Sequence, residues 1–258
     1  MTDFLDVDGV RLEVACHPGR AGAPTMVWLH EGLGSVSLWR DVPAEVSRMT
    51  GLASLVYSRR GYGQSDPVDV PRPLTYMHDE GRQVLPRLLH AAGVGEAILV
   101  GHSDGGSIAL VAAGSGALPP SRARGLVLLA PHVVCEELSV RSIAEAREAY
   151  LHNDLRARLA RHHADVDGAF WGWNRAWLDP DFRHWDLREF LPGVRAPVLL
   201  IQGADDPYGT LAQLDLIEEG VAGPVRRLVV PGGHAPHRDA RGETLAAIAA
   251  FANGLESR

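Results

Sequence analysis

The sequence predicts an α/β protein in which a mostly parallel, doubly wound sheet carries an inserted helical segment. Short continuous apolar runs rich in Val, Leu and Ile recur along the chain, as in strands that are buried on both faces of a parallel sheet. Helix-like segments lie between several of these runs. One long interval, which contains no strand candidate, interrupts the alternation and predicts the insertion.

Composition and charge exclude several classes of protein. With 258 residues, of which 46% are hydrophobic and 22% charged, the chain can bury a large core as one domain with an insertion. The formal net charge of −7 and the absence of a basic run argue against a nucleic-acid partner. The start of the chain lacks the pattern of a signal peptide, and no apolar run has membrane-spanning length. Cys16 and Cys135 are far apart and fit neither a disulfide framework nor a zinc site. We therefore expect a cytoplasmic protein without a membrane partner; no feature predicts its oligomeric state.

The elements of the sheet can be assigned in chain order. A hairpin is expected first, because Asp8-Gly9 suits a tight primed turn and Val10, Leu12 and Val14 alternate after it. The predicted buried strands are 25–29, 53–57, 97–100, 125–130, 197–201 and 227–230. The predicted helices between them include 76–92, 105–113 and 211–219.

The interval without a strand predicts a helical cap over the sheet. One long helix is expected over 139–163, with Leu151, Leu155 and Leu159 spaced by four. Four of the six tryptophans follow it, and we expect most of them to build the core of the cap rather than to contact a ligand. These are Trp171, Trp173, Trp177 and Trp185. The predicted division is a core formed by 1–134 and 193–258, with the cap at 135–192.

The stretch Gly101-His102-Ser103-Asp104-Gly105 carries the strongest chemical signal. It matches G-x-S-x-G between a predicted strand and a predicted helix, which is the context of a nucleophile elbow. Such a sharp turn holds the serine in a strained backbone conformation, and side chains two residues to either side would collide. Ser65 is a contrasting case, because Gly63–Pro67 lacks the second glycine and follows a loop. We therefore predict that Ser103 is a nucleophile and that Ser65 is a turn residue.

A serine needs a base and a group that orients the base, and both follow later strands. Asp206 comes after the strand at 197–201, and His234 after the strand at 227–230, in the chain order Ser, Asp, His. The carboxyl ends of parallel strands meet at one edge, so the three residues should converge there. Asp205 and His237 are the alternatives; we favour Asp206 for its distance from Gly203, and His234 for the Gly-Gly before it. We expect five other histidines to be surface residues: His17, His152, His162, His163 and His184.

Backbone amides are the expected donors to the negative oxygen that forms when the serine attacks. One should be the N–H of Asp104, at the start of the helix, and the other an N–H of the loop 30–34. No group of histidines has metal-ligand spacing, and Gly61-x-Gly63 lacks the third glycine of a dinucleotide site. The sequence thus predicts no metal and no cofactor.

Five stretches together resemble the α/β-hydrolase fold superfamily, in its branch of capped serine hydrolases: carboxylesterases, enol-lactonases and C–C hydrolases of aromatic degradation. The stretches are LHEGLGSVSLWRD (29–41), YSRRGYGQSDP (57–67), VGHSDGG (100–106), IQGADDPYG (201–209) and GGHAPH (232–237). The resemblance implies Ser103 as nucleophile, His234 as base and Asp206 as orienting acid. It also implies an oxyanion hole made by the amides of Gly32 and Asp104, and a structural rather than catalytic role for the loop at 59–63.

The chain departs from this family pattern at two positions. Glu31 stands where relatives have glycine, which leaves the second oxyanion amide open between Gly32 and Leu33. Asp104 stands where an apolar residue is common. We expect both carboxylates to point outward, because a carboxylate inside the site would oppose the oxyanion. Serine at position 103 argues against epoxide hydrolase and haloalkane dehalogenase chemistry, which in these relatives proceeds through an aspartyl ester.

Three functions remain after this comparison. The first is hydrolysis of a small carboxylic ester, thioester or lactone through an acyl-enzyme. The second is cleavage of a C–C bond in a vinylogous diketone, which arginines of the cap facing inward would favour. The third is a non-catalytic receptor or scaffold, which the presence of all three triad residue types disfavours. The arginines concerned in the second case are Arg147, Arg156, Arg158, Arg175 and Arg183.

Overall fold

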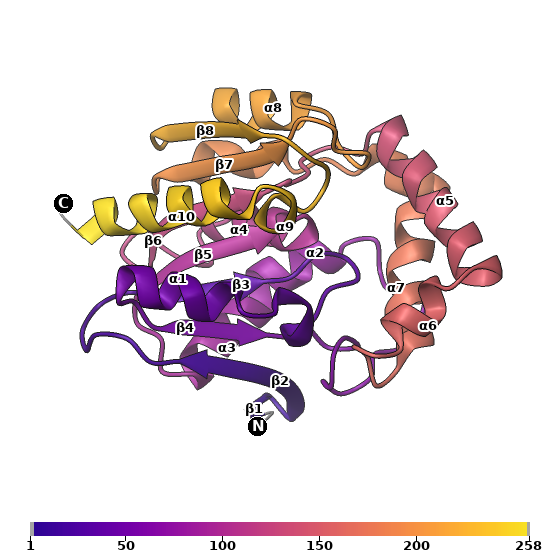
Figure 1. Ribbon diagram of the computed structural model, residues 1–258, viewed down its shortest axis with the longest axis horizontal. Helices are drawn as coiled ribbons and strands as arrows, with labels where there is room; N and C mark the ends of the chain where they lie inside the picture. The colour runs from indigo at the N-terminus through magenta and orange to yellow at the C-terminus, as the bar shows by residue number, and fades with distance from the viewer. Residues whose placement is uncertain (1–2, 257–258) are drawn as a thin grey trace.

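The computed structural model describes residues 3–256, and these form a twisted sheet with helices on both faces (Figure 1). Within the described residues the sheet has eight strands in the order β1-β2-β4-β3-β5-β6-β7-β8. Strands β2 and β4 pair antiparallel, as do β1 and β2, and all other pairs are parallel. The strands are β1 (Asp3–Val7), β2 (Val10–His17), β3 (Thr25–Leu29), β4 (Ser54–Tyr57), β5 (Ala97–His102), β6 (Ala123–Leu129), β7 (Val198–Gly203) and β8 (Val225–Val230). The predicted fold class, a mostly parallel α/β sheet, is confirmed.

The first two strands form the predicted hairpin. Asp8 and Gly9 have φ values of 54° and 81°, which the two central residues of a primed turn require. The side chain of Asp6 accepts a hydrogen bond from the N–H of Gly9 at 3.0 Å and closes the turn.

Two sets of helices cover the two faces of the sheet. Helices α1 (Val42–Thr50) and α10 (Arg241–Glu256) lie on one face, in front of the sheet in Figure 1. The helices that pack on the other face are α2 (Tyr76–Asp79), α3 (Leu85–Ala91), α4 (Asp104–Gly114) and α8 (Ala212–Gly220). The predicted helix 76–92 is continuous along the chain, but Glu80–Val84 forms a π-helical turn between α2 and α3.

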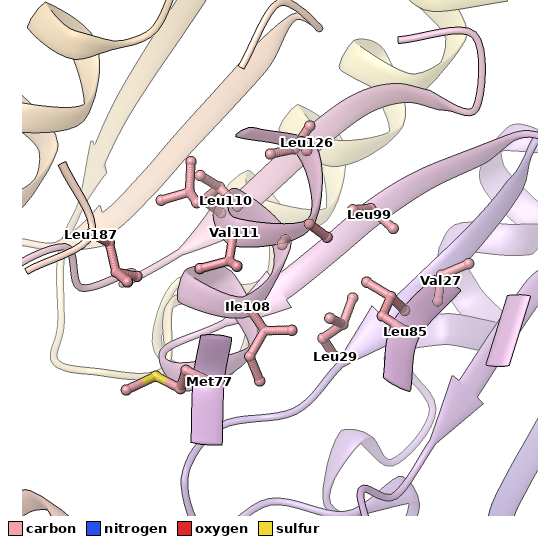
Figure 2. Close-up of a cluster of buried hydrophobic side chains, with 14 of the residues drawn as sticks. Val27, Leu29, Met77, Leu85, Leu99, Ile108, Leu110, Val111, Leu126 and Leu187 are labelled. Atoms are coloured by element: carbon pink, nitrogen blue, oxygen red, sulfur yellow. The ribbon is translucent and has the colours of Figure 1, made fainter. Parts of the chain in front are cut away.

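Alternate strand residues serve the two faces, and this accounts for the continuous apolar runs in the sequence. Val27, Leu29 and Leu99 belong to the core between the sheet and α4, where they lie with Ile108 (Figure 2). Their neighbours along the chain, such as Trp28, belong to the opposite core under α1 and α10. Both faces of these strands are therefore buried.

Residues 135–192, which the sequence predicts to be an insertion and which are called the inserted segment below, form helices beyond one edge of the sheet. Helices α5 (Glu137–His152), α6 (Leu155–Leu159) and α7 (Val166–Leu178) lie together opposite the carboxyl ends of the parallel strands, at the right of Figure 1. The prediction of one long helix over 139–163 is wrong. The chain leaves the helix at Asn153, with φ −122° and ψ −157°, and turns back into α6.

Candidate active site

The turn between β5 and α4 holds Ser103 in a strained conformation. Ser103 has φ 53° and ψ −119°, a left-handed region that a side chain rarely adopts. Its N–H donates to the carbonyl of Leu129 at 2.8 Å. A Cβ on Gly101 would lie 2.3 Å from the carbonyl oxygen of Gly105, and a Cβ on Gly105 would lie 2.1 Å from that of Leu29. Both glycines are therefore required by backbone contacts that no side-chain movement relieves.

The loops after β7 and β8 bring Asp206 and His234 together. The Nδ1–H of His234 donates to the Asp206 carboxylate, with both oxygens at 2.9 Å. Burial by itself would raise the pKa of Asp206, but the hydrogen bond and charge of His234 lower it below its ordinary value. The N–H of Tyr208 also donates to Asp206, at 2.8 Å. Asp206 is thus held ionised against the imidazole.

The two alternative residues lie elsewhere. Asp205 is exposed, and its N–H donates to the carbonyl of Gly232. His237 is buried against Trp39 and His102, and burial lowers its pKa to about 2. His102 separates it from the site, and the Nε2–H of His102 donates to the carbonyl of His234 at 2.6 Å. This bond attaches the loop of His234 to the elbow.

Ser103 and His234 line one cavity of about 320 Å³. Over residues 3–256, His234 makes its side-chain hydrogen bonds with Asp206 and none with Ser103. Serine–histidine contacts of this kind are often long until substrate binds. The three residues singled out from the sequence therefore meet at one edge of the sheet, with the acid and the base already joined.

A buried arginine holds the loop that follows β3. The guanidinium of Arg59 donates to the carbonyls of His30 at 2.5 Å and Glu31 at 3.0 Å. The N–H of Arg59 donates to Nε2 of His30, so the proton of that imidazole is on Nδ1 and is donated to the carbonyl of Glu31. With these carbonyls engaged, the loop is fixed beside the elbow. This agrees with the structural role expected for the loop at 59–63.

The side chain of Glu31 does not point outward, contrary to expectation. Glu31 lines the cavity, and its Oε2 lies 3.4 Å from Nδ1 of the buried His102. Burial opposes its ionisation, but the contacts with His102 and His30 lower the pKa of Glu31 well below its ordinary value. The carboxylate folds back over its own loop and occupies the space beside Gly34. A Cβ at position 34 would lie 2.3 Å from Oε2.

The side chain of Asp104 also points inward, and the expectation was wrong there too. Asp104 is 1% exposed and lines the cavity. Its Oδ2 accepts from the hydroxyl of Tyr76 at 2.5 Å and lies 3.9 Å from the guanidinium of Arg59. A buried cation and a hydroxyl donor therefore take the place of solvent beside this carboxylate.

The remainder of the cavity wall is largely apolar. The inserted segment contributes five residues, Ser139, Ile143, Leu155, Trp173 and Trp177. Leu33, Tyr208, Ala235 and Arg238 also line this part of the cavity. Trp185 packs with Phe182 and Trp177 inside the segment, as expected for its core, whereas Trp173 and Trp177 do contact the cavity. All five of the arginines considered above are exposed. Four of them form ion pairs with acidic residues of the same segment. The pairs are Arg147 with Glu148, Arg156 with Asp167, Arg158 with Asp154, and Arg183 with Glu137.

One buried histidine, His163, was wrongly predicted from the sequence, and another, His132, was not identified there. His163 is 4% exposed rather than a surface residue: Nδ1 accepts from the N–H of Gly63, and Nε2 donates to the carbonyl of Leu33, both at 3.0 Å. His132 lines the cavity and follows β6 at the same edge of the sheet as Asp206 and His234. The rule that selected those two residues could have found His132 as well.

The described residues contain neither a metal-binding group of side chains nor a membrane-spanning helix. Among residues 3–256, no group of three or more His, Cys, Asp or Glu side chains is arranged to hold a metal ion. In the same range, no helix has both the length and the apolar character needed to cross a membrane.

Comparison with known proteins places this geometry in context. A family model described as alpha/beta hydrolase fold matches residues 24–181. Epoxide hydrolase A of Mycobacterium tuberculosis (strain ATCC 25618 / H37Rv) is 35% identical over 79 residues, 30% of this chain and 24% of that protein. The sn-1-specific diacylglycerol lipase ABHD11 of Danio rerio is 27% identical over 159 residues, 60% of this chain and 48% of that protein. The matched regions thus span about a quarter and about half of these relatives.

A solved structure extends the similarity over the whole chain at the level of the fold. The esterase EaEST from Exiguobacterium antarcticum superposes with a TM-score of 0.76 and 20% identity, covering 98% of this chain and 99% of that one.

Proposed function

Since the chain belongs to the alpha/beta hydrolase fold family, we propose that it is a serine hydrolase that cleaves a small carboxylic ester, thioester or lactone through an acyl-enzyme. The match to the family confirms the predicted fold and the predicted hydrolase class. One observation carries the finer proposal: His234, which is bonded to Asp206, lines the same cavity as a serine held in a strained turn. We also propose that the inserted segment is a cap, because it supplies much of the cavity's apolar wall.

The proposed reaction has two halves that use the same residues. The Oγ of Ser103 attacks the carbonyl carbon while Nε2 of His234 takes the hydroxyl proton, and Asp206 stabilises the resulting imidazolium. The tetrahedral intermediate collapses, His234 gives its proton to the leaving alcohol or thiol, and the acyl group remains on Ser103. Water then attacks the acyl carbon with His234 as base, which releases the acid and restores the serine.

Backbone amides next to the elbow are the proposed oxyanion donors. The N–H groups of Gly32, Leu33 and Asp104 donate to no other residue in the described part of the chain. Arg59 engages the neighbouring carbonyls of the loop and so fixes the amides that follow them. The N-terminus of α4 adds its partial positive charge at Asp104. We favour Gly32 over Leu33, as in the family pattern.

The cavity favours an ester over an acidic diketone. A C–C hydrolase of the second type would need cationic side chains in the cap directed at an acidic substrate, and the five candidates are exposed. Two carboxylates, Glu31 and Asp104, line the cavity, and its one arginine among the described residues, Arg238, comes from outside the segment and donates to the carbonyl of Leu38. A non-catalytic scaffold gains no support, because it does not require an ionised Asp206 bonded to His234.

Labelling with a fluorophosphonate, mapped by mass spectrometry, tests the proposal. We expect one adduct, on Ser103, and hydrolysis of short aryl esters that falls by about 10⁴-fold or more in Ser103→Ala. His234→Ala should abolish the labelling. Ser115→Ala, at an exposed position just beyond α4, is the matched control and should retain both activities. A folded protein with no adduct on Ser103 would contradict the proposal.

A further inference from the structure

Three side-chain atoms of the cavity wall have no hydrogen-bond partner among the described residues, although their residues are buried: Oδ1 of Asp104, Nδ1 of His132 and Nδ1 of His102. Nδ1 of His102 faces the Glu31 carboxylate at 3.4 Å, which leaves Oδ1 of Asp104 and Nδ1 of His132, in residues 1% and 2% exposed. Both residues line the cavity that contains Ser103. A buried polar atom that stays unpaired costs free energy comparable to a lost hydrogen bond, so such atoms in a binding site point to a ligand. Both atoms can be identified as acceptors.

Asp104 accepts at Oδ1 because its other oxygen is already engaged. The hydroxyl of Tyr76 donates to Oδ2, and Arg59 lies nearest to that same oxygen. A carboxylate has two acceptor oxygens, and only Oδ2 is engaged here. Oδ1 is therefore the oxygen of this carboxylate that can still accept a hydrogen bond.

His132 accepts at Nδ1 because its other nitrogen must donate. Its Nε2 lies 3.0 Å from the carbonyl oxygen of Tyr208, which can only accept, so the proton is on Nε2. Burial and the neighbouring His234 lower the pKa of His132, which keeps the imidazole neutral. Nδ1 consequently carries a lone pair.

Trp177 joins the two acceptors into one structural unit. Its ring packs edge-on against His132 at a centroid distance of 5.3 Å. Its Nε1–H donates at 3.1 Å to the hydroxyl of Tyr76, which in turn donates to Asp104. Trp177 and Tyr76 thus hold Asp104 and His132 in place. The N–H of the indole and the O–H of the phenol are both engaged within this network, so neither is available to the two acceptors.

From these contacts we infer that the cavity selects substrates carrying a hydrogen-bond donor, an amino or hydroxyl group, which Asp104 Oδ1 and His132 Nδ1 receive. The inference rests on the proposed function and names its substrate class. A substrate without the donor leaves both buried acceptors unpaired, and this is how sites reject apolar isosteres. The apolar wall accommodates the remainder of the substrate.

The test compares esters of equal shape that differ in one group. The first series has 4-nitrophenyl esters of alanine, lactic acid and isobutyric acid, with amino, hydroxyl and methyl groups at one position. The second series places the same three groups on the alcohol: 2-aminopropyl, 2-hydroxypropyl and isobutyl acetate. We expect kcat/KM in at least one series to favour a donor over the methyl group by tenfold or more. An advantage for amino over hydroxyl esters identifies a cationic substrate, and equal rates identify a neutral one.

Variants then assign the preference to the two acceptors. Asp104→Ala and His132→Phe should each reduce the donor-to-methyl ratio of kcat/KM several-fold, and Asp104→Asn should reduce it less. The ratio within one variant cancels losses common to both substrates, including partial misfolding. Asp154→Asn, at an exposed carboxylate of the inserted segment, should keep the wild-type ratio.

Two results would overturn the inference: hydrolysis of both series without preference, or a preference that survives in Asp104→Ala and His132→Phe. If instead the wild type hydrolyses no ester and Ser103 takes no label, the proposed function itself fails, and this inference fails with it.

Discussion

The elbow and the inserted segment form two sides of one cavity, but they are specified in different ways. At the elbow, Ser103, Gly101 and Gly105 lie within five residues, and the turn is dictated by contacts between backbone atoms. In the inserted segment, charged side chains cover the outer surface while Trp173 and Trp177 of α7 face the cavity, and the chain turns at Asn153 between α5 and α6. Local sterics thus determine the catalytic turn, whereas packing between distant segments determines the surface that meets the substrate.

Contacts between the two regions make them one structure. His163 of the inserted segment bridges Gly63 and Leu33, and therefore supports the proposed oxyanion loop from outside. Gly32 of that loop lies under Trp173, whose Nε1 would be 2.2 Å from a Cβ at position 32. Substitutions at the elbow, at the bridge and on the outer surface should accordingly have successively smaller effects.

The largest effect is expected at the elbow. Gly105→Ala places a Cβ 2.1 Å from the carbonyl oxygen of Leu29, so β3 and α4 must separate. We expect the free energy of unfolding to fall by about 4 kcal/mol or more, measured by urea denaturation. Gly254→Ala is the matched control, because a Cβ there meets nothing within 4 Å in helix α10; it should be neutral or stabilising by up to about 1 kcal/mol. Equal effects of the two substitutions would contradict the close packing of the elbow.

The bridge between the regions should respond to pH. Burial lowers the pKa of His163 from 6.5 to about 4. Above pH 6.5 the imidazole is neutral in both folded and unfolded chains, and its contribution to stability is complete. Between pH 6.5 and 4 the unfolded chain binds a proton that the folded chain does not, so up to about 3 kcal/mol of stability is lost as pH falls.

The variant His163→Gln should remove this part of the pH dependence. The measurement is the unfolding free energy of wild type and variant from pH 7.5 to 4.0, with exposed His184→Gln as control. The difference between wild type and His163→Gln should shrink as pH falls. A constant difference across the range would show that His163 does not link the segment to the loop through a neutral imidazole.

The smallest effect is expected on the outer surface of the inserted segment. Arg156 pairs with Asp167 in solvent, and exposed ion pairs contribute little. Arg156→Ala should leave both the melting temperature and ester hydrolysis at wild-type values. A clear loss of activity would instead mean that the arginines of this segment reach the substrate, and would revive the C–C hydrolase alternative.

Prediction from the sequence succeeded where the signal was local or periodic. The strands, the hairpin at Asp8-Gly9 and the helix after Ser103 follow from apolar runs and turn residues, and all are present. The burial predicted for 227–230 is wrong, because β8 is an edge strand and Val229 is 39% exposed. Asp206 and His234 were found because residues after parallel strands share one edge, although their roles in catalysis stay predictions. The long helix over 139–163 was wrong because its apolar spacing continues past the position where the segment turns back.

By itself, the sequence determined the α/β sheet, the place of the elbow and the edge at which a site could assemble, since these depend on periodicity, backbone sterics and strand direction. Only the tertiary structure decided the environment of the polar side chains. Asp104 turns inward because Arg59 and Tyr76 lie next to it, and Glu31 because His102 does. Each of these partners is distant in sequence from the carboxylate that it contacts. A buried charge is stable only beside its partners, and packing between distant segments supplies them.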